Sequence, residues 1–173
     1  MRFKRNYIGA LKNWASWIIS RFKPLTVHTE AIIFDSVWEE IKKKVEEKKI
    51  VKWYIMTPVN YDLYKSSFNA KISKSEISKI MKERYLWMIK KNQKLELHIH
   101  LSLIMDNLSY EEQDKLFRES INWIKKELKF TPKEFVPGWW SYNKNTLKLC
   151  KKYGLKMIYS KDYDFCHDYE WGL

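Results

Sequence analysis

Apolar and polar residues alternate strictly in segment 94–101, which reads Lys-Leu-Glu-Leu-His-Ile-His-Leu. Leucine or isoleucine takes every second position, and Glu96, His98 and His100 fall on the other parity. A period of two is typical of a β-strand, because alternate side chains point to opposite faces. The pattern therefore predicts a strand that carries both imidazoles on one face. A surface strand with one solvated face would show the same alternation, so the pattern alone leaves both readings open.

Helical periodicity recurs along the rest of the chain. Apolar residues spaced three and four apart predict a helix over 7–22 and further helices after three Ser-x-x-Glu capping boxes, which begin at Ser36, Ser73 and Ser109. We expect these three helices to end near residues 49, 91 and 128. Asn143 or Asn145 is expected to cap a last helix, which stops at Gly154.

Short apolar runs between these helices predict strands at 25–33, 51–56, 94–101, 134–137 and 155–158, with a loop from Pro58 through Asn69. Strands that alternate with helices are typical of an α/β protein with a mainly parallel sheet. In parallel barrels, site residues gather at the carboxyl ends of the strands. The sequence therefore predicts a candidate site where the strands end and the capping boxes follow.

Glu30, His98 and His100 are the candidate metal ligands at that edge. Thr26-Val27-His28-Thr29-Glu30 resembles the later stretch, because His28 and Glu30 share one face of a predicted strand. Two histidines and one carboxylate form a common ligand set for a divalent metal ion. Zinc is the first expectation, and nickel, cobalt or manganese would suit the same donors.

The length of 173 residues suits one domain over 25–173, preceded by a basic amphipathic helix within 1–24. The net charge is +12, and half of this excess precedes Glu30, the first acidic residue. That helix either packs on the domain or lies on an anionic membrane surface through residues 1–23. We expect a cytoplasmic protein, with membrane association as the alternative. Nucleic-acid binding is disfavoured, because the excess charge is concentrated at the N-terminus.

Three stretches resemble motifs of the polysaccharide deacetylase family (carbohydrate esterase family 4, NodB-like). Segment 26–30 lies where relatives carry an Asp-Asp or Asp-x-Glu pair, and Leu97-His98-Ile99-His100 resembles a variant Leu-His-x-His motif. Segment 135–155 resembles a strand reading Arg-x-Pro-x-Gly, followed by a helix with Asn-x-x-Thr-Leu and a glycine turn. The resemblance implies an irregular (β/α) barrel, here shortened by one or two units. It also implies removal of acetyl groups from N-acetylated sugars with a bound divalent metal.

The resemblance also implies roles for single residues. Glu30, His98 and His100 match the metal-ligand positions, and His28 falls at the position of the general base. His167, or His28 itself, is the candidate for the catalytic acid. The implied substrate groove follows the fourth strand and contains Pro137, Trp139, Trp140 and Tyr142.

Two departures from the family pattern leave an alternative open. His28 replaces the usual base carboxylate, and Val136 stands where the motif has arginine. A catalytically impaired glycan-binding protein of the same fold would fit these departures.

Overall fold

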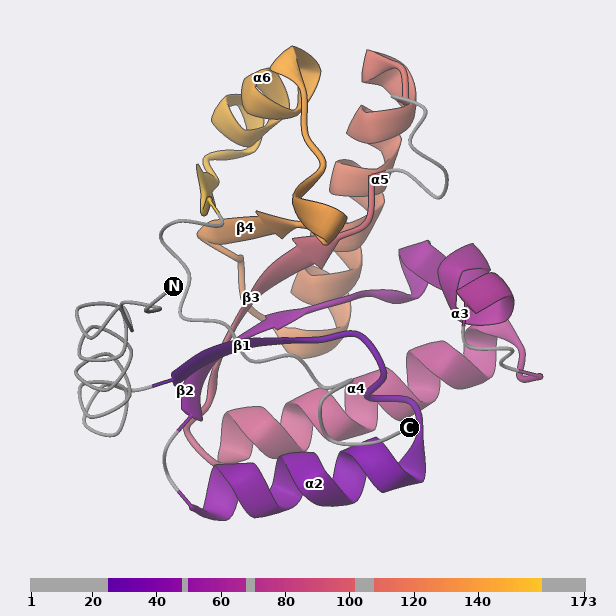
Figure 1. The fold of residues 1–173 in the computed structure, drawn as a ribbon, viewed down its shortest axis with the longest axis vertical. Helices are drawn as coiled ribbons and strands as arrows, with labels where there is room; N and C mark the ends of the chain where they lie inside the picture. Colours follow the sequence, from indigo (N-terminus) through magenta and orange to yellow (C-terminus); the bar gives the residue numbers. More distant parts are fainter. Residues whose placement is uncertain (1–24, 48–49, 68–70, 102–107, 160–173) are drawn as a thin grey trace, which may run out of the picture.

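A five-stranded parallel sheet runs through this computed structural model, which describes residues 25–47, 50–67, 71–101 and 108–159 (Figure 1). The strands lie in the order of the sequence, so each pairs with the next one along the chain. They are β1 (Leu25–Thr29), β2 (Ile50–Ile55), β3 (Lys94–Ile99), β4 (Glu134–Pro137) and β5 (Lys156–Met157). The predicted α/β class with a parallel sheet is confirmed, and sequential order is the arrangement that a (β/α) barrel requires.

Helices connect consecutive strands and cover one face of the sheet. Figure 1 shows α2 and α4 lying side by side below the strands, α5 running from the upper right to behind the strands, and α6 above them. The helices are α2 (Asp35–Glu46), α3 (Tyr61–Ser67), α4 (Lys74–Lys90), α5 (Tyr110–Trp123) and α6 (Lys144–Tyr153). A π-helical turn, Ile124–Leu128, extends α5, and short 3₁₀ turns occupy Pro58–Asn60 and Gly138–Trp140.

The two faces of the sheet differ in chemistry. Val27, Trp53, Leu97 and Phe135 are fully buried in the main apolar core, which also contains buried residues of the helices. The opposite face, here called the inner face, carries the other parity of each strand: His28, Tyr54, Glu96, His98 and Val136. These inner-face residues are also buried, so the reading of β3 as a strand with one solvated face is wrong.

Two of the three predicted capping boxes are confirmed. The hydroxyl of Ser73 and that of Ser109 each accept a hydrogen bond from the backbone N–H of the glutamate three residues later. The side chain of that glutamate accepts from the backbone N–H of the serine. The box at Ser36 is wrong, because α2 begins one residue earlier and has no side-chain cap. Arg84 of α4 donates to the carbonyl oxygens of Ile32 and Phe34, which ties the turn before α2 to α4 but is no substitute for a side-chain acceptor at the helix N-terminus.

The predicted boundaries need two further corrections. The first strand ends at Thr29 rather than 33, because the chain turns where Phe34 N–H donates to the Ala31 carbonyl. The predicted loop 58–69 contains α3, whose Leu63 and Tyr64 enter the core. Of the two residues predicted to cap α6, Asn143 is the one that does so. Gly154 ends the helix in the left-handed conformation, at φ 66°.

The expected N-terminal helix lies outside the described residues, so its packing and membrane contact stay predictions. Within the residues that the structure describes, none of the helices has the length and apolar character needed to cross a membrane.

Candidate metal centre

Four polar side chains meet on the inner face, where β1 and β3 end. His28 lies on β1 and pairs with Tyr54 of β2, and Glu30 follows β1 directly. His98 lies on β3, and His100 comes one residue after Ile99, the last residue of that strand. Relative exposures of 1–5% leave all four side chains out of bulk water.

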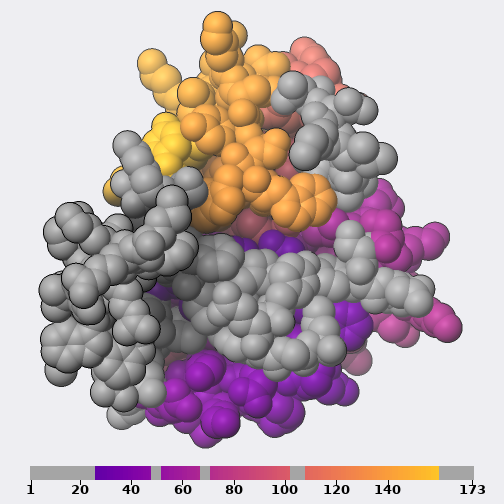
Figure 2. Space-filling view, viewed as in Figure 1, coloured from indigo at the N-terminus to yellow at the C-terminus, as the bar shows by residue number. Residues whose placement is uncertain are grey.

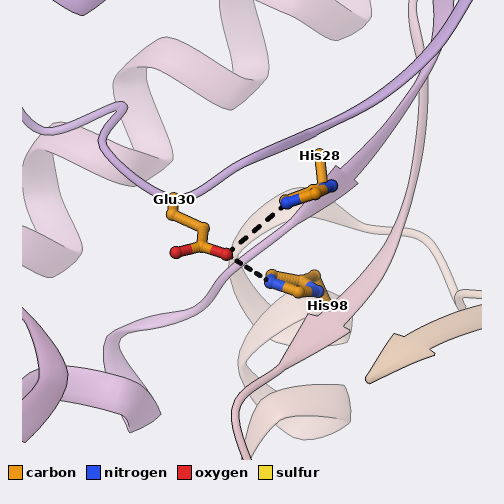
Figure 3. Close-up of side chains that lie close together, drawn as sticks. All are labelled: His28, Glu30 and His98. Atoms are coloured by element: carbon orange, nitrogen blue, oxygen red, sulfur yellow. Dashed lines mark hydrogen bonds and ion pairs between the residues drawn. The ribbon is translucent and has the colours of Figure 1, made fainter. Parts of the chain in front are cut away.

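A single carboxylate oxygen, Glu30 Oε1, is the centre of this group. It lies 2.9 Å from His100 Nε2, 3.1 Å from His98 Nε2 and 3.6 Å from His28 Nε2. The two Nε2 atoms of His98 and His100 are 3.2 Å apart. Figure 3 shows His28 and His98 both directed toward this oxygen. The structure therefore brings together the three predicted ligands, although 70 residues separate Glu30 from His100.

The spacing of these atoms fits a divalent cation. Ligands at 2.0–2.1 Å from a tetrahedral zinc ion lie about 3.3 Å from one another, close to the 2.9–3.2 Å separations found here. His28, Glu30 and His98 likewise offer atoms that all lie within 4.8 Å of one another. Both sets share Glu30 and His98. We treat Glu30, His98 and His100 as the tighter triad, because its three separations are the shortest.

The protonation of His98 supports the same conclusion. Its Nδ1 lies 3.0 Å from the Val136 carbonyl oxygen, which can only accept, so Nδ1 donates its hydrogen. With a hydrogen on Nδ1, the other ring nitrogen of His98, Nε2, is the one that faces Glu30 and His100. Lone pairs of a carboxylate and an imidazole at this distance repel unless a proton or cation lies between them. A backbone carbonyl that fixes the tautomer is also the usual second partner of a metal-binding histidine.

Two neighbours that the sequence did not single out hold His100 in place. Asn60 Nδ2 donates to the His100 carbonyl at 3.0 Å, which ties the end of β3 to the turn after β2. A Cβ atom on Gly138 would lie 2.4 Å from the imidazole of His100, so only glycine leaves room for the ring. Gly138 belongs to the motif that resembles the deacetylases, and its position directly after Pro137 was the available signal. Asn60 lies in the segment taken as a loop and carried no signal.

The aromatic segment after β4 borders the same group. The Trp139 ring lies edge-on to the His100 ring, with 4.4 Å between the two ring centroids. Trp139 is 54% exposed and Tyr142 is 45% exposed. Trp140 is half-buried and packs on Tyr54, Val136 and Ile158 instead. Trp139 and Trp140 both have positive φ, at 50° and 56°. Non-glycine residues rarely adopt this conformation, which costs about 1–3 kcal/mol each and is frequent at functional sites.

Other predicted residues have different places. Pro137 is buried at the end of β4, where it pairs with Ile99. His167 lies outside the described residues. Val136 stands in a small apolar cluster with Tyr54 and Ile158, so the position of the motif arginine carries no charge.

A second polar group occupies the amino end of the inner face. Glu96 Oε2 accepts the backbone N–H of Lys133 at 2.7 Å and that of Glu134 at 2.9 Å. Glu134 Oε2 accepts from Lys52 Nζ at 2.8 Å and from the Tyr54 hydroxyl at 2.5 Å. Burial opposes the ionisation of Glu134, but these two hydrogen bonds outweigh it and hold the pKa of its carboxyl below the usual range.

Comparison with known proteins places this fold. No protein-family description matches the sequence, and no curated protein matches it significantly. Among solved structures, a carbohydrate esterase family 4 pseudoenzyme from Bacillus anthracis superposes with a TM-score of 0.54 at 12% identity, over 80% of this chain and 44% of that one.

Two further structures are similar to this chain. A variant of the peptidoglycan deacetylase from Bacillus subtilis gives a TM-score of 0.52 at 15% identity, over 78% of this chain and 55% of that one. The family 4 carbohydrate esterase from Streptomyces lividans, solved with acetate, gives a TM-score of 0.51 at 14% identity, over 78% of this chain and 59% of that one.

These matches define the class of fold. The chain has the α/β fold of the family 4 polysaccharide deacetylases, and it spans about half the length of those structures. The resemblance predicted from the motifs is confirmed at the level of the fold.

Proposed function

We propose that this protein is a metal-dependent hydrolase that removes acetyl groups from an N-acetylated sugar or glycan. The observation that supports this most is the convergence of Glu30 Oε1 on the Nε2 atoms of His98 and His100 within 3.1 Å. The deacetylase fold and the exposed aromatic rings beside these ligands agree with it.

Glu30, His98 and His100 would hold the divalent cation, with zinc as the expected ion for this donor set. The cation supplies Lewis-acid polarisation of the acyl carbonyl and of water. The protein restricts water at the site, because all three side chains are at most 2% exposed. Their fixed positions at the ends of two strands mean that little reorganisation is needed when substrate binds.

His28 is the proposed proton acceptor. Its Nε2 lies 3.6 Å from Glu30 Oε1, on the same inner face as His98. A neutral imidazole accepts a proton from water near pH 7, as a general base requires. The leaving amine needs a proton donor, and we assign this role to His167.

Trp139 and Tyr142 are the proposed sugar-binding side chains. Their exposed rings offer apolar faces to a pyranose next to His100, while Trp140 supports the turn from within. Backbone groups after Pro137 are proposed to contact the acyl oxygen.

Acetate release from an N-acetylglucosamine oligomer tests the proposal, with protein reconstituted with zinc, cobalt, nickel or manganese. We expect release that depends on the added metal. The His28→Ala variant should retain the metal and lose about 10²–10⁴-fold in rate. Metal content near zero in wild-type protein, or equal rates for wild type and His28→Ala, would contradict the proposal.

A glycan-binding protein without turnover is the second candidate. Apolar contacts of Val136 with Tyr54 and Ile158 favour it, because no charged group at this position can orient a base. One similar structure is itself described as a pseudoenzyme. Saturable binding of the oligomer by metal-loaded protein, without acetate release from any N-acetylated sugar, would support this candidate.

A further inference from the structure

We propose that the exposed face of segment 139–151 binds an anionic glycan, so that the preferred substrate is a polysaccharide with carboxylate groups beside its N-acetylated sugars. This inference deepens the proposed function, because it names the substrate class of the same site. The segment contains most of the 3₁₀ turn after β4 and most of α6. Figure 2 shows its surface in orange, in the upper part of the view.

Large apolar side chains are exposed in this segment. Trp139, Tyr142 and Leu147 are the large hydrophobic residues that are exposed within the described part of the chain, and they fall within nine positions of one another. Flat aromatic rings that face water offer apolar surface to a sugar ring. The ring of Trp139 also meets the ring of His100, so the segment directly adjoins a candidate metal ligand.

The same segment belongs to a stretch whose positive charge no carboxylate offsets. From Phe135 to Tyr159 the sequence contains five lysines and neither aspartate nor glutamate. Each of the other described α-helices, α2, α3, α4 and α5, contains at least one acidic residue. Among these helices, α6 is therefore the one whose charge is most favourable for an anion.

Three of the five lysines share the exposed face of α6. Lys144, Lys148 and Lys151 are exposed, and none of them forms an ion pair with another described residue. Residues three and four apart lie on one side of a helix, about 5–6 Å from one another. Lys152 differs, because its ammonium group lies 2.8 Å from Asp114 of α5. Lys144 is the first residue of α6, where the helix dipole disfavours a cation, so helix stability does not explain its position.

The position of Trp139 favours a glycan among anionic partners. Its backbone has φ 50°, and its ring lies edge-on to the buried His100, so the ring is held beside a candidate ligand. A lipid surface would instead favour apolar side chains that insert together into the headgroup region. A polymer that alternates uncharged N-acetylated sugars with carboxylate-bearing sugars can contact the ring and the lysines at once. Such a polymer matches both parts of the segment.

The test compares two glycans that share N-acetylglucosamine: hyaluronan oligomers, in which glucuronate alternates with it, and uncharged chitin oligomers of equal length. For the zinc-loaded full chain we expect about tenfold tighter binding of the hyaluronan oligomer at low salt, the combined effect of three exposed ion pairs. Salt screens exposed charges, so the preference should fall as salt is added. The Lys144→Gln/Lys148→Gln/Lys151→Gln variant should bind the two glycans equally. Isothermal titration measures these affinities.

A second triple variant separates the α6 face from the overall charge. Lys43→Gln/Lys79→Gln/Lys90→Gln removes the same net charge from exposed positions of α2 and α4. Figure 1 shows these two helices below the strands and α6 above them. This matched control should therefore keep the wild-type preference for hyaluronan. A control variant that loses the preference would overturn the inference, because any lysine would then serve.

Two further outcomes would overturn the inference. The first is equal affinity of wild type for the two glycans. If wild type then binds phosphatidylglycerol vesicles and the α6 variant does not, the face belongs to a lipid surface instead. The second is acetate release from both oligomers at equal kcat/KM, which leaves the proposed function standing. A hyaluronan preference without acetate release would support the anionic-glycan surface and contradict the proposed function.

Discussion

Glu30 and Glu96 are two carboxylates on one side of the same sheet, each 2% exposed, and their surroundings are opposite. Glu96, near the amino end, accepts two backbone N–H groups and lies 3.2 Å from Lys94 Nζ. Glu30, at the carboxyl end, faces the ring nitrogens of three histidines. A buried carboxylate that accepts from backbone N–H groups stabilises a fold, whereas one grouped with several imidazoles offers a set of ligand atoms to a cation.

The largest expected effect comes from removing two donors at the carboxyl end. The His98→Ala/His100→Ala double variant should bind less than a tenth of the metal that wild type binds, because only Glu30 and His28 remain. Metal at a hundred times its dissociation constant should stabilise wild type by about 2.7 kcal/mol and leave the double variant unchanged. Elemental analysis and thermal unfolding measure both effects.

Tyr54→Phe, which removes only the hydroxyl that donates to Glu134, is the control and should bind metal as wild type does. Equal metal content in wild type and the double variant would remove the distinction between the two ends.

A second test uses the lack of a side chain at Gly138. The Cβ atom of Gly138→Ala would displace the His100 ring, so metal affinity should fall tenfold or more. Gly154→Ala is a matched control. The added Cβ atom meets nothing within 4 Å, but the backbone at φ 66° is unfavourable for alanine. It should cost about 1 kcal/mol of stability and leave the metal affinity unchanged. Isothermal titration with zinc distinguishes the two, and equal affinities would show that Gly138 does not position His100.

At the amino end we expect loss of stability without loss of metal. Glu96→Ala leaves the N–H groups of Lys133 and Glu134 without their carboxylate acceptor, at a cost of about 2–4 kcal/mol. Urea unfolding should detect this change, while zinc stoichiometry stays at the wild-type value. Glu96→Gln retains one acceptor oxygen and should cost less. A Glu96→Ala protein that is as stable as wild type would show that this carboxylate has no structural role.

The smallest effect is a pH dependence from Glu134. Because its folded pKa is depressed, its carboxylate stabilises the protein above the unfolded pKa of about 4.3. That contribution is lost as the pH falls through the folded value. Glu134→Gln should therefore cost about 1 kcal/mol at pH 7 and progressively less below pH 4.

Urea unfolding from pH 3 to 7 measures the difference. Glu83→Gln, at an exposed position of α4, provides the background slope. A cost for Glu134→Gln that is independent of pH would contradict the prediction.

Much of the candidate site could be predicted, because the information was local in the sequence. The alternation over 94–101 placed His98 and His100 on one face, and the β/α order placed Glu30 at the same edge. The close approach of Glu30 to both histidines depended on β2 lying between β1 and β3, which follows from the sequential order of the strands.

Other features depended on tertiary contacts and could not be predicted. Nothing local shows that Arg84 donates to the Phe34 carbonyl before α2, or that Asn60 donates to the His100 carbonyl. The burial of both faces of β3 was hidden, because period-2 alternation is the same whether the polar face is wet or dry. The failed loop 58–69 shows the same limit, since α3 is only seven residues long and is held by two core side chains.

The sequential strand order also has a consequence for biosynthesis. Each strand pairs with the one made just before it, and the candidate ligands come from the first and third strands. All four polar side chains have therefore been translated once residue 100 is made. Since domains fold as the N-terminal part emerges from the ribosome, a cation could be captured by a nascent chain before β4 and α6 have folded. Ribosome-bound chains from which β3 has just emerged would then be the earliest species able to retain metal.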